Sequence, residues 1–198
     1  MLGLHFEVIP GDVDETVKKD EPSEHYVQRL AVEKARSLKI NPDQVIIAAD
    51  TVVVDRGEIL GKPGDKADAK RMLQKLRGHT HTVMTAITLV SGKTGQIWMD
   101  LYKTAVPMRE YADLEIEGYI ESGDPMDKAG AYAIQHPGFH PVARMDGCFA
   151  SVMGLPVCHV ILQMRKMDLQ PDTGFFAGCE TLLEYNCPVS NAILNGEM

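Results

Sequence analysis

Apolar residues recur along this chain with two different spacings, which predict a protein that mixes strands and helices. One run, Val45 to Val54, is apolar at every position except Asp50 and Thr51. A β-branched run of this length is typical of a strand buried on both faces. An Asp-Arg-Gly turn follows, and Glu58 to Leu60 is predicted to return as a short strand that carries Lys62 back toward the same end of the sheet.

The rest of the pattern predicts further helices and strands in alternation. Helices are expected over Glu24 to Lys39 with Ser23 as N-cap, from the cap Asp65 to Gly78 at the C′ position, over Tyr111 to Glu121, over Val157 to Lys166 after Pro156, and over Phe175 to Tyr185. Strands are expected at Phe6 to Ile9, His81 to Val90, Gln96 to Val106, the end of Asp127 to Gln135, and Asp146 to Gly154. Because a short glycine-containing loop joins two of these strands as an antiparallel hairpin, the predicted sheet is mixed rather than purely parallel.

Length and charge narrow the class of protein. At 198 residues the chain lies at the upper end of a single domain, and two lobes around a cleft would suit this size. A net charge of -8 argues against nonspecific binding to nucleic acids or anionic membranes, because both require a positive field. No apolar run reaches the roughly 18 residues of a membrane span, and the first residues lack the pattern of a signal peptide, so a cytoplasmic protein is expected.

Cysteines and histidines give only weak indications of a metal site. The four cysteines, Cys148, Cys158, Cys179 and Cys187, form no C-x-x-C pair and are expected to be reduced and mostly buried. The pairs His79 and His81, and His136 and His140, could ligate a metal with Cys148. Neither pair has a recognised metal spacing, so positions in turns and at the rim of the fold are the favoured interpretation.

The carboxylate of Asp50 raises the main question about function. A charge inside an apolar strand requires a compensating cation, metal or hydrogen-bond donor. Candidates are Glu15 in an acidic segment, the adjacent Glu33 and Lys34, which lie about 100° apart on a helix, and Lys62. Carboxylates that hold a hard divalent cation and lysines that balance phosphate oxygens would suit phosphate chemistry. A purely structural set of salt bridges explains the same residues equally well.

Known phosphate-binding and hydrolase signatures are missing from the sequence. There is no Walker A motif, no G-x-G-x-x-G and no G-x-S-x-G. Gln135, at the end of a predicted strand, could hydrogen-bond the edge of a nucleobase, because its amide both donates and accepts. The alternative for a single glutamine is an ordinary surface position.

Several motifs taken together, in order along the chain, resemble one family. They are Arg29-Leu30-Ala31-Val32-Glu33-Lys34-Ala35, Ala49-Asp50-Thr51-Val52-Val53, Gly61-Lys62-Pro63, Leu76-Arg77-Gly78-His79-Thr80-His81, Asp127-Lys128-Ala129-Gly130-Ala131-Tyr132-Ala133-Ile134-Gln135 and Val152-Met153-Gly154-Leu155-Pro156. This set resembles the Maf proteins, nucleoside triphosphate pyrophosphatases once described as septum formation inhibitors. The resemblance covers about residues 4 to 162, and the combination is far more specific than any single motif.

The resemblance implies a fold, a reaction and a set of site residues. The implied fold is α/β, with a mixed extended central sheet flanked by helices and a cleft between two lobes, related to the inosine triphosphate pyrophosphatases. The implied reaction is metal-dependent hydrolysis of a nucleoside triphosphate, with Mg²⁺ or Mn²⁺, to the monophosphate and pyrophosphate by a homodimer. By position, the resemblance makes Asp50 the proton acceptor, Glu15, Glu33, Lys34 and Lys62 part of the metal and phosphate site, and Thr51 and Gln135 determinants of base selectivity. The residues before Gln135 are similar to the branch that acts on dTTP and UTP.

The sequence departs from the family pattern at its beginning. Members of the family begin with a strand and a Ser-x-Ser-Pro-Arg-Arg segment that binds the triphosphate, whereas this sequence starts after that segment. Loss of charge-assisted bonds from arginine would cost about 1.5 to 3 kcal/mol each, so weak or absent catalysis is expected from the chain as given. Residues 1–166 are expected to form the pyrophosphatase domain and residues 167–198 an extension. The alternative to an enzyme is a noncatalytic nucleotide-binding or cell-division regulatory module.

Overall fold

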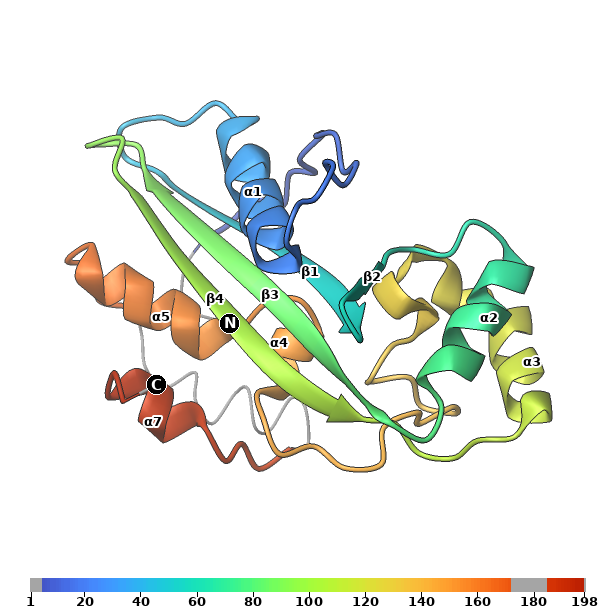
Figure 1. The fold of residues 1–198 in the computed structure, drawn as a ribbon. Helices are drawn as coiled ribbons and strands as arrows, with labels where there is room; N and C mark the ends of the chain where they lie inside the picture. Colours follow the sequence, from blue (N-terminus) through green and yellow to red (C-terminus); the bar gives the residue numbers. More distant parts are fainter. Residues whose placement is uncertain (1–4, 172–184, 198) are drawn as a thin grey trace.

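The computed structural model describes residues 5–171 and 185–197, and these residues form an α/β fold on one four-stranded sheet (Figure 1). The strands are β1 (Val45–Asp55), β2 (Glu58–Leu60), β3 (Thr80–Ser91) and β4 (Ile97–Pro107). Their order is β2-β1-β3-β4, and all three pairings are antiparallel. The predicted α/β class is therefore confirmed, while the described residues contain no parallel pair that would make the sheet mixed.

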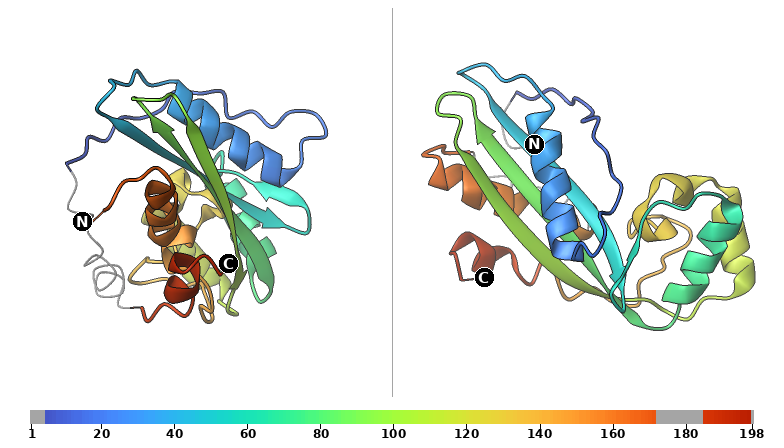
Figure 2. Two further views of the ribbon diagram at one scale, coloured as in Figure 1. Left: turned by 90° about the vertical axis from the view of Figure 1, so that its left-hand side faces the viewer. Right: turned by 45° about the horizontal axis from the view of Figure 1, so that its top comes forward.

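Helices occupy three positions around this sheet. The helices are α1 (Ser23–Arg36), α2 (Lys66–Leu76), α3 (Asp113–Glu121), α4 (Phe149–Val152), α5 (Val157–Lys166) and α7 (Ser190–Leu194), with 3-10 turns η1 (Asp124–Asp127) and η2 (Ala129–Ala131). Figures 1 and 2 show α1 on one face of the sheet and α5 on the other, while α2, α3 and the two 3-10 turns gather beyond one end of the strands. No helix among the described residues is long and apolar enough to cross a membrane.

The apolar core is divided in the same way as the helices. Alternate residues of β1 and β3 point to opposite faces, so Val52 and Ala86 pack with Leu30 of α1, whereas Ile87 packs with Val160 of α5. A third cluster joins α2, α3 and the 3-10 turns to the ends of the strands. Of β1 itself, only the last four residues are fully buried, so the strand is less enclosed than its sequence predicted.

Local sequence signals account for the elements that were predicted correctly. The β1–β2 turn has positive φ at both central residues, Arg56 (49°) and Gly57 (85°), as a tight hairpin turn requires. The side chain of Asp65 caps α2 by accepting a hydrogen bond from the Asp68 backbone N–H at 2.8 Å. Gly78 follows the α2 C-cap with φ of 72°, and a Cβ there would overlap the Glu110 carboxylate.

Three of the predicted strands are wrong. Residues 6–9 have no strand pairing, and Phe6 and Val8 are exposed. Residues 132–135 follow η2 as irregular backbone, because Gly130 turns the chain with φ of 68° and lies directly against Val53. The segment 146–154 contains the short helix α4 instead, started by Cys148, whose sulfur accepts a hydrogen bond from the Ser151 N–H.

Two helix predictions have other outcomes. Pro22, rather than Ser23, is the N-cap of α1, and the Ser23 hydroxyl contacts the Met84 sulfur at 3.7 Å. The helix predicted over Phe175 to Tyr185 falls, apart from its last residue, outside the described residues.

Candidate functional site

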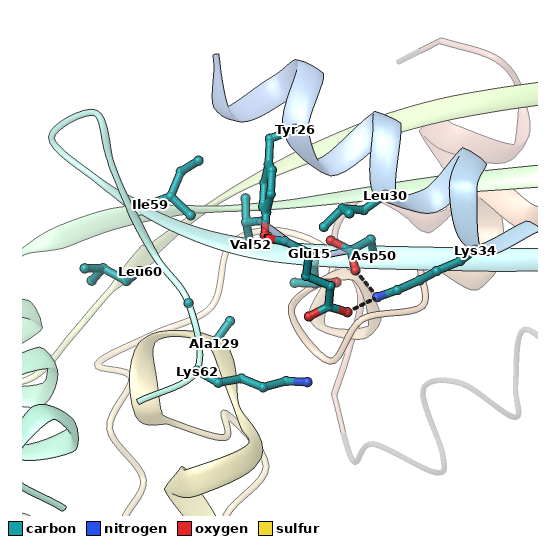
Figure 3. A pocket seen from close by; sticks show the side chains of 12 residues that line it. Glu15, Tyr26, Leu30, Lys34, Asp50, Val52, Ile59, Leu60, Lys62 and Ala129 are labelled. Carbon is teal, nitrogen blue, oxygen red and sulfur yellow. Dashed lines mark hydrogen bonds and ion pairs between the residues drawn. The ribbon is translucent and has the colours of Figure 1, made fainter. Parts of the chain in front are cut away.

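A pocket of about 140 Å³ lies where α1, β1 and the segment after β2 meet η2 (Figure 3). Its charged lining consists of Glu15, Lys34, Asp50 and Lys62. Apolar side chains from the same elements form most of the remaining wall. This volume is below the roughly 300 Å³ at which pockets enclose a whole drug-sized ligand, so it suits one part of a larger ligand, such as its phosphates.

Two carboxylates and one ammonium group form the centre of the pocket. Lys34 Nζ lies 2.5 Å from Asp50 Oδ1 and 2.8 Å from Glu15 Oε1. Figure 3 shows the three side chains converging from α1, from β1 and from the loop before α1. The structure thus brings together three of the residues that the sequence proposed for phosphate chemistry, although they are about 16 to 35 positions apart.

Burial and pairing change the pKa values of these groups in different directions. Burial disfavours the charged form of Asp50 and raises its pKa, although Lys34 opposes this change. The pKa of Glu15 is lowered, chiefly by its hydrogen bond to Lys34. Burial works against the charge of Lys34, but hydrogen bonds to both carboxylates outweigh it and raise the lysine pKa. Asp50 is therefore the stronger base of the two carboxylates, which is the property that a proton acceptor needs.

Lys62 supplies a second positive charge at the pocket. It follows β2, and the chain there is held by a hydrogen bond of 3.0 Å from the Gly130 N–H to the Gly61 carbonyl. Within the part of the chain that the structure describes, Lys62 forms no ion pair, and Figure 3 shows its side chain extending along the pocket. An ammonium group with no carboxylate partner is available to a phosphate group.

The loop that carries Glu15 is fastened to α1 by two side chains that sequence reasoning missed. The Tyr26 hydroxyl donates to the Glu15 carbonyl at 2.8 Å, and Arg29 Nη2 donates to the Thr16 carbonyl at 3.0 Å. Arg29 also pairs with Glu21 at 2.6 Å. The helical spacing of Tyr26 and Arg29 was visible in the sequence, but nothing there indicated that both would bind this loop.

Glu33 and Gln135 are not brought to the pocket. Glu33 pairs with Arg29 at 3.1 Å on the flank of α1, and Gln135 is exposed in the irregular segment after η2. Neither side chain is part of the pocket lining. Their predicted roles in metal binding and base selectivity stay predictions.

Thr51 lines the pocket from the opposite side of β1 to Asp50. Both residues can line one pocket because it lies at the edge of β1, where β2 pairs only with residues 53 to 55. At Asp50 and Thr51, β1 has a neighbour on the β3 side alone within the described ranges. The Thr51 hydroxyl lies 2.9 Å from that of Thr85 on β3.

The histidines have structural partners. His79 Nε2 lies 2.8 Å from Asp55 Oδ1, and His81 Nε2 lies 2.8 Å from the Tyr132 hydroxyl. His136 Nδ1 accepts hydrogen bonds from the backbone of its own turn. Residues 5–171 and 185–197 contain no group of three or more His, Cys, Asp or Glu side chains arranged to hold a metal ion. The position of His136 in a turn agrees with the favoured interpretation, whereas His81 is only 3% exposed and so does not lie at the rim of the fold.

Comparison with known proteins identifies relatives over most of the chain. Residues 1–167 match the family model described as Maf-like protein. A protein of Syntrophus aciditrophicus named dTTP/UTP pyrophosphatase is 40% identical over 168 residues, which cover 84% of this chain and 82% of the relative. Proteins with the same name from Geotalea uraniireducens and Caldicellulosiruptor saccharolyticus are 43% and 38% identical, over 83% and 84% of this chain and 86% of each relative.

The family match includes every residue around the pocket, from the loop that carries Glu15 to η2. The relatives named above match more than four fifths of the chain at about 40% identity. The family match and the similarity to these relatives show that the chain belongs to the Maf family.

Proposed function

We propose that this chain hydrolyses dTTP and UTP, or modified forms of them, to the monophosphate and pyrophosphate. The observation that carries the proposal is the pairing of Lys34 with both Asp50 and Glu15 at a pocket that Lys62 also lines. The relatives supply the choice of reaction, because they are named dTTP/UTP pyrophosphatase. A site with this balance of acidic and basic groups fits a triphosphate, which needs cations near its oxygens and a base near the attacked phosphorus.

In the proposed reaction, Asp50 acts on the attacking water. Its carboxylate takes a proton as the water oxygen bonds to the α-phosphorus, the bond from that phosphorus to the bridging oxygen breaks, and pyrophosphate leaves. The burial that raises the pKa of Asp50 makes it a better proton acceptor. Lys34 and Lys62 bind phosphate oxygens, where charge develops during the step.

A divalent cation fits the chemistry of this donor set. Asp50 and Glu15 already converge on one cation, the Lys34 ammonium group, with hard oxygen atoms of the kind that Mg²⁺ and Mn²⁺ prefer. Mg²⁺ is commonly held by one or two carboxylates together with substrate phosphates, so a third acidic ligand is not required. In the proposal Asp50 and Glu15 hold the metal, which when bound neutralises phosphate charge. Glu33 would join them only by leaving Arg29.

The pocket also fits a cleft between two lobes. One lobe consists of the sheet with α1 and α5, and the other of α2, α3 and the 3-10 turns. The pocket lining includes residues of both, from Asp50 of the first to Ala129 of the second. We propose that residues 1–166 form the catalytic domain and that residues 167–198 are an extension to it.

The decisive experiment measures pyrophosphate release from dTTP, UTP, CTP, ATP and GTP, with Mg²⁺, with Mn²⁺ and with a chelator. We expect release from dTTP and UTP, loss of release with the chelator, and loss of release in Asp50→Asn. Nucleotide binding without release of pyrophosphate under any condition would contradict the enzymatic proposal and favour a noncatalytic nucleotide-binding module. Equal activity in the wild type and Asp50→Asn would remove Asp50 from its role.

A further inference from the structure

A buried hydroxyl group controls the hydrogen-bonding direction of Thr51. Thr85, on β3 directly opposite Thr51, has no exposed surface and cannot touch a ligand. Its Oγ1 lies 2.8 Å from the Ser151 carbonyl oxygen and 2.9 Å from Thr51 Oγ1. The three oxygen atoms therefore form a short chain that runs from the α4 segment to Thr51 on β1.

The position of each proton in this chain follows from simple counting. A carbonyl oxygen has no proton, so at 2.8 Å the Thr85 hydroxyl must donate to Ser151. A hydroxyl group has one proton, which Thr85 has then used. The Thr51 hydroxyl must therefore donate its proton to Thr85 Oγ1. Toward any other group, Thr51 Oγ1 can then act only as a hydrogen-bond acceptor. Thr51 is held as a hydrogen-bond acceptor.

The segment of Gly154 lies beside the Thr51 hydroxyl group. A Cβ built on Gly154 would lie 3.4 Å from Thr51 Oγ1, which is an ordinary van der Waals distance, so Gly154 is a close neighbour of this oxygen. Its φ of 105° also favours glycine over other residues. On either side of Gly154, Met153 and Leu155 are 43% and 45% exposed, so two apolar side chains flank this glycine at the surface.

We propose that Thr85 is a positioning residue for base selectivity, because it fixes the Thr51 hydroxyl as an acceptor for the N3–H of uracil or thymine. Cytosine carries a lone pair at N3 in place of this N–H, so its N3 would face the lone pairs of Thr51. The inference rests on the proposed function and adds to it a reason for choosing among pyrimidines. Discrimination of this kind is strong when a mismatched polar group is left unpaired.

The test compares Thr85→Val with Thr85→Ser. Valine has nearly the shape of threonine but no hydroxyl group, so Thr51 becomes free to rotate and to donate to cytosine N3. We expect the preference for UTP over CTP, measured as the ratio of kcat/KM, to fall by about tenfold in Thr85→Val. Serine keeps the hydroxyl and should restore the ratio. Because a general loss of packing would affect both nucleotides alike, an unchanged ratio in Thr85→Val would overturn the proposal.

Binding measurements separate this inference from the proposed reaction. Dissociation constants for the nonhydrolysable α,β-methylene analogues of UTP and CTP should show the same change of ratio in Thr85→Val. That change, in a protein that releases no pyrophosphate, would refute the proposed reaction and support the inference. Pyrophosphate release with an unchanged binding ratio would support the proposed reaction and refute the inference. The double variant Thr51→Val, Thr85→Val should lose no more selectivity than Thr51→Val alone, and an additive loss would contradict action through Thr51.

Discussion

Two acidic residues of the same strand, Asp50 and Asp55, show how similar hydrogen-bonded carboxyl groups can have different consequences. The side chain of Asp50 is 9% exposed and pairs with Lys34, and that of Asp55 is 1% exposed and pairs with His79. The Asp50 pair lies at the edge of β1, where the strand has no β2 neighbour, and it lines a pocket. The Asp55 pair lies where β1 pairs with β2, and it lines no part of that pocket.

The surroundings of Asp55 indicate a structural role. Its Oδ1 lies 2.8 Å from His79 Nε2, while Oδ2 lies 3.9 Å from Lys75 Nζ and has no hydrogen-bond partner among the described residues. Lys75 itself pairs with Glu58 on the β2 hairpin. This network joins β1, β2, α2 and the start of β3. A buried carboxylate with a cationic partner is thus no evidence of catalysis by itself, and access to a pocket is what distinguishes Asp50.

The largest expected effect is on catalysis at Asp50. Asp50→Asn keeps an oxygen that can accept from Lys34 but removes the proton acceptor, so kcat should fall by about 10²- to 10⁴-fold. The free energy of unfolding should change by less than about 1 kcal/mol, because Lys34 keeps Glu15 as an ion-pair partner and is not left as an unpaired charge. Pyrophosphate release and thermal unfolding would be measured on the same preparation. If Asp50→Asn keeps more than a tenth of the wild-type kcat, Asp50 is not the proton acceptor, and it does not differ from Asp55 in this respect.

Asp55→Asn is the matched variant, and we expect it to lower stability while leaving catalysis nearly unchanged. Loss of the buried charge leaves Lys75 and His79 with a weaker partner and should cost about 3 kcal/mol of stability, near the lower end for breaking a buried pair. For a protein of this size that corresponds to a fall in Tm of roughly 6–12 °C. The kcat of the folded protein should stay within about twofold of the wild type. A large fall in kcat with unchanged Tm would show that Asp55 serves the reaction.

The pH dependence of the reaction tests whether Glu15 and Lys34 change the pKa of Asp50 in the directions that the structure indicates. Asp50 accepts a proton only when ionised, so kcat/KM should decline as pH falls through its pKa, which burial raises above the ordinary value. The charge of Glu15 also raises the Asp50 pKa and shares Lys34 with it. Glu15→Gln should therefore shift the acid limb of the profile to lower pH.

Lys34→Met serves as the control for this shift. Lys34 lowers the pKa of Asp50 by hydrogen bond and by charge, so its removal should move the acid limb to higher pH in whatever activity remains. The position of the limb is compared, and not the rate, because Lys34 is also proposed to bind phosphate. Shifts in the same direction for both variants would contradict the assignment of the limb to Asp50.

The smallest expected effect concerns Tyr26, which holds the loop of Glu15. Tyr26→Phe removes the hydrogen bond to the Glu15 carbonyl, worth about 0.5–1.5 kcal/mol, and should raise KM a few fold while kcat stays within about twofold. Tyr119→Phe is the control, because its hydroxyl bonds Asp124 at 2.6 Å and lines no part of the pocket. That variant should lower Tm without raising KM. An equal rise of KM in both would assign the effect to general loosening of the fold.

Local sequence patterns determined much of the secondary structure. Helices α1, α2 and α5 and both hairpins agree with the predictions to within a few residues, because apolar spacing, caps and glycine turns act over neighbouring positions. The predicted strands at 6–9, 132–135 and 146–154 did not form. A strand also needs a partner edge, which a short apolar run does not specify. Gly130, just before the second of these segments, and Gly154, at the end of the third, take positive φ.

The sequence by itself also determined the family and the pocket residues Glu15, Lys34, Asp50 and Lys62. Only the tertiary structure decided which other side chains contact these four residues. Glu33 and Lys34 are adjacent in sequence but have different partners. Arg29, one turn earlier on α1, pairs with Glu33, whereas Lys34 pairs with Asp50. The roles of Tyr26 and Thr85 depend on contacts between segments that lie far apart in the chain. Side-chain periodicity shows which face a residue occupies, whereas the partner that it meets there is set by how the elements pack.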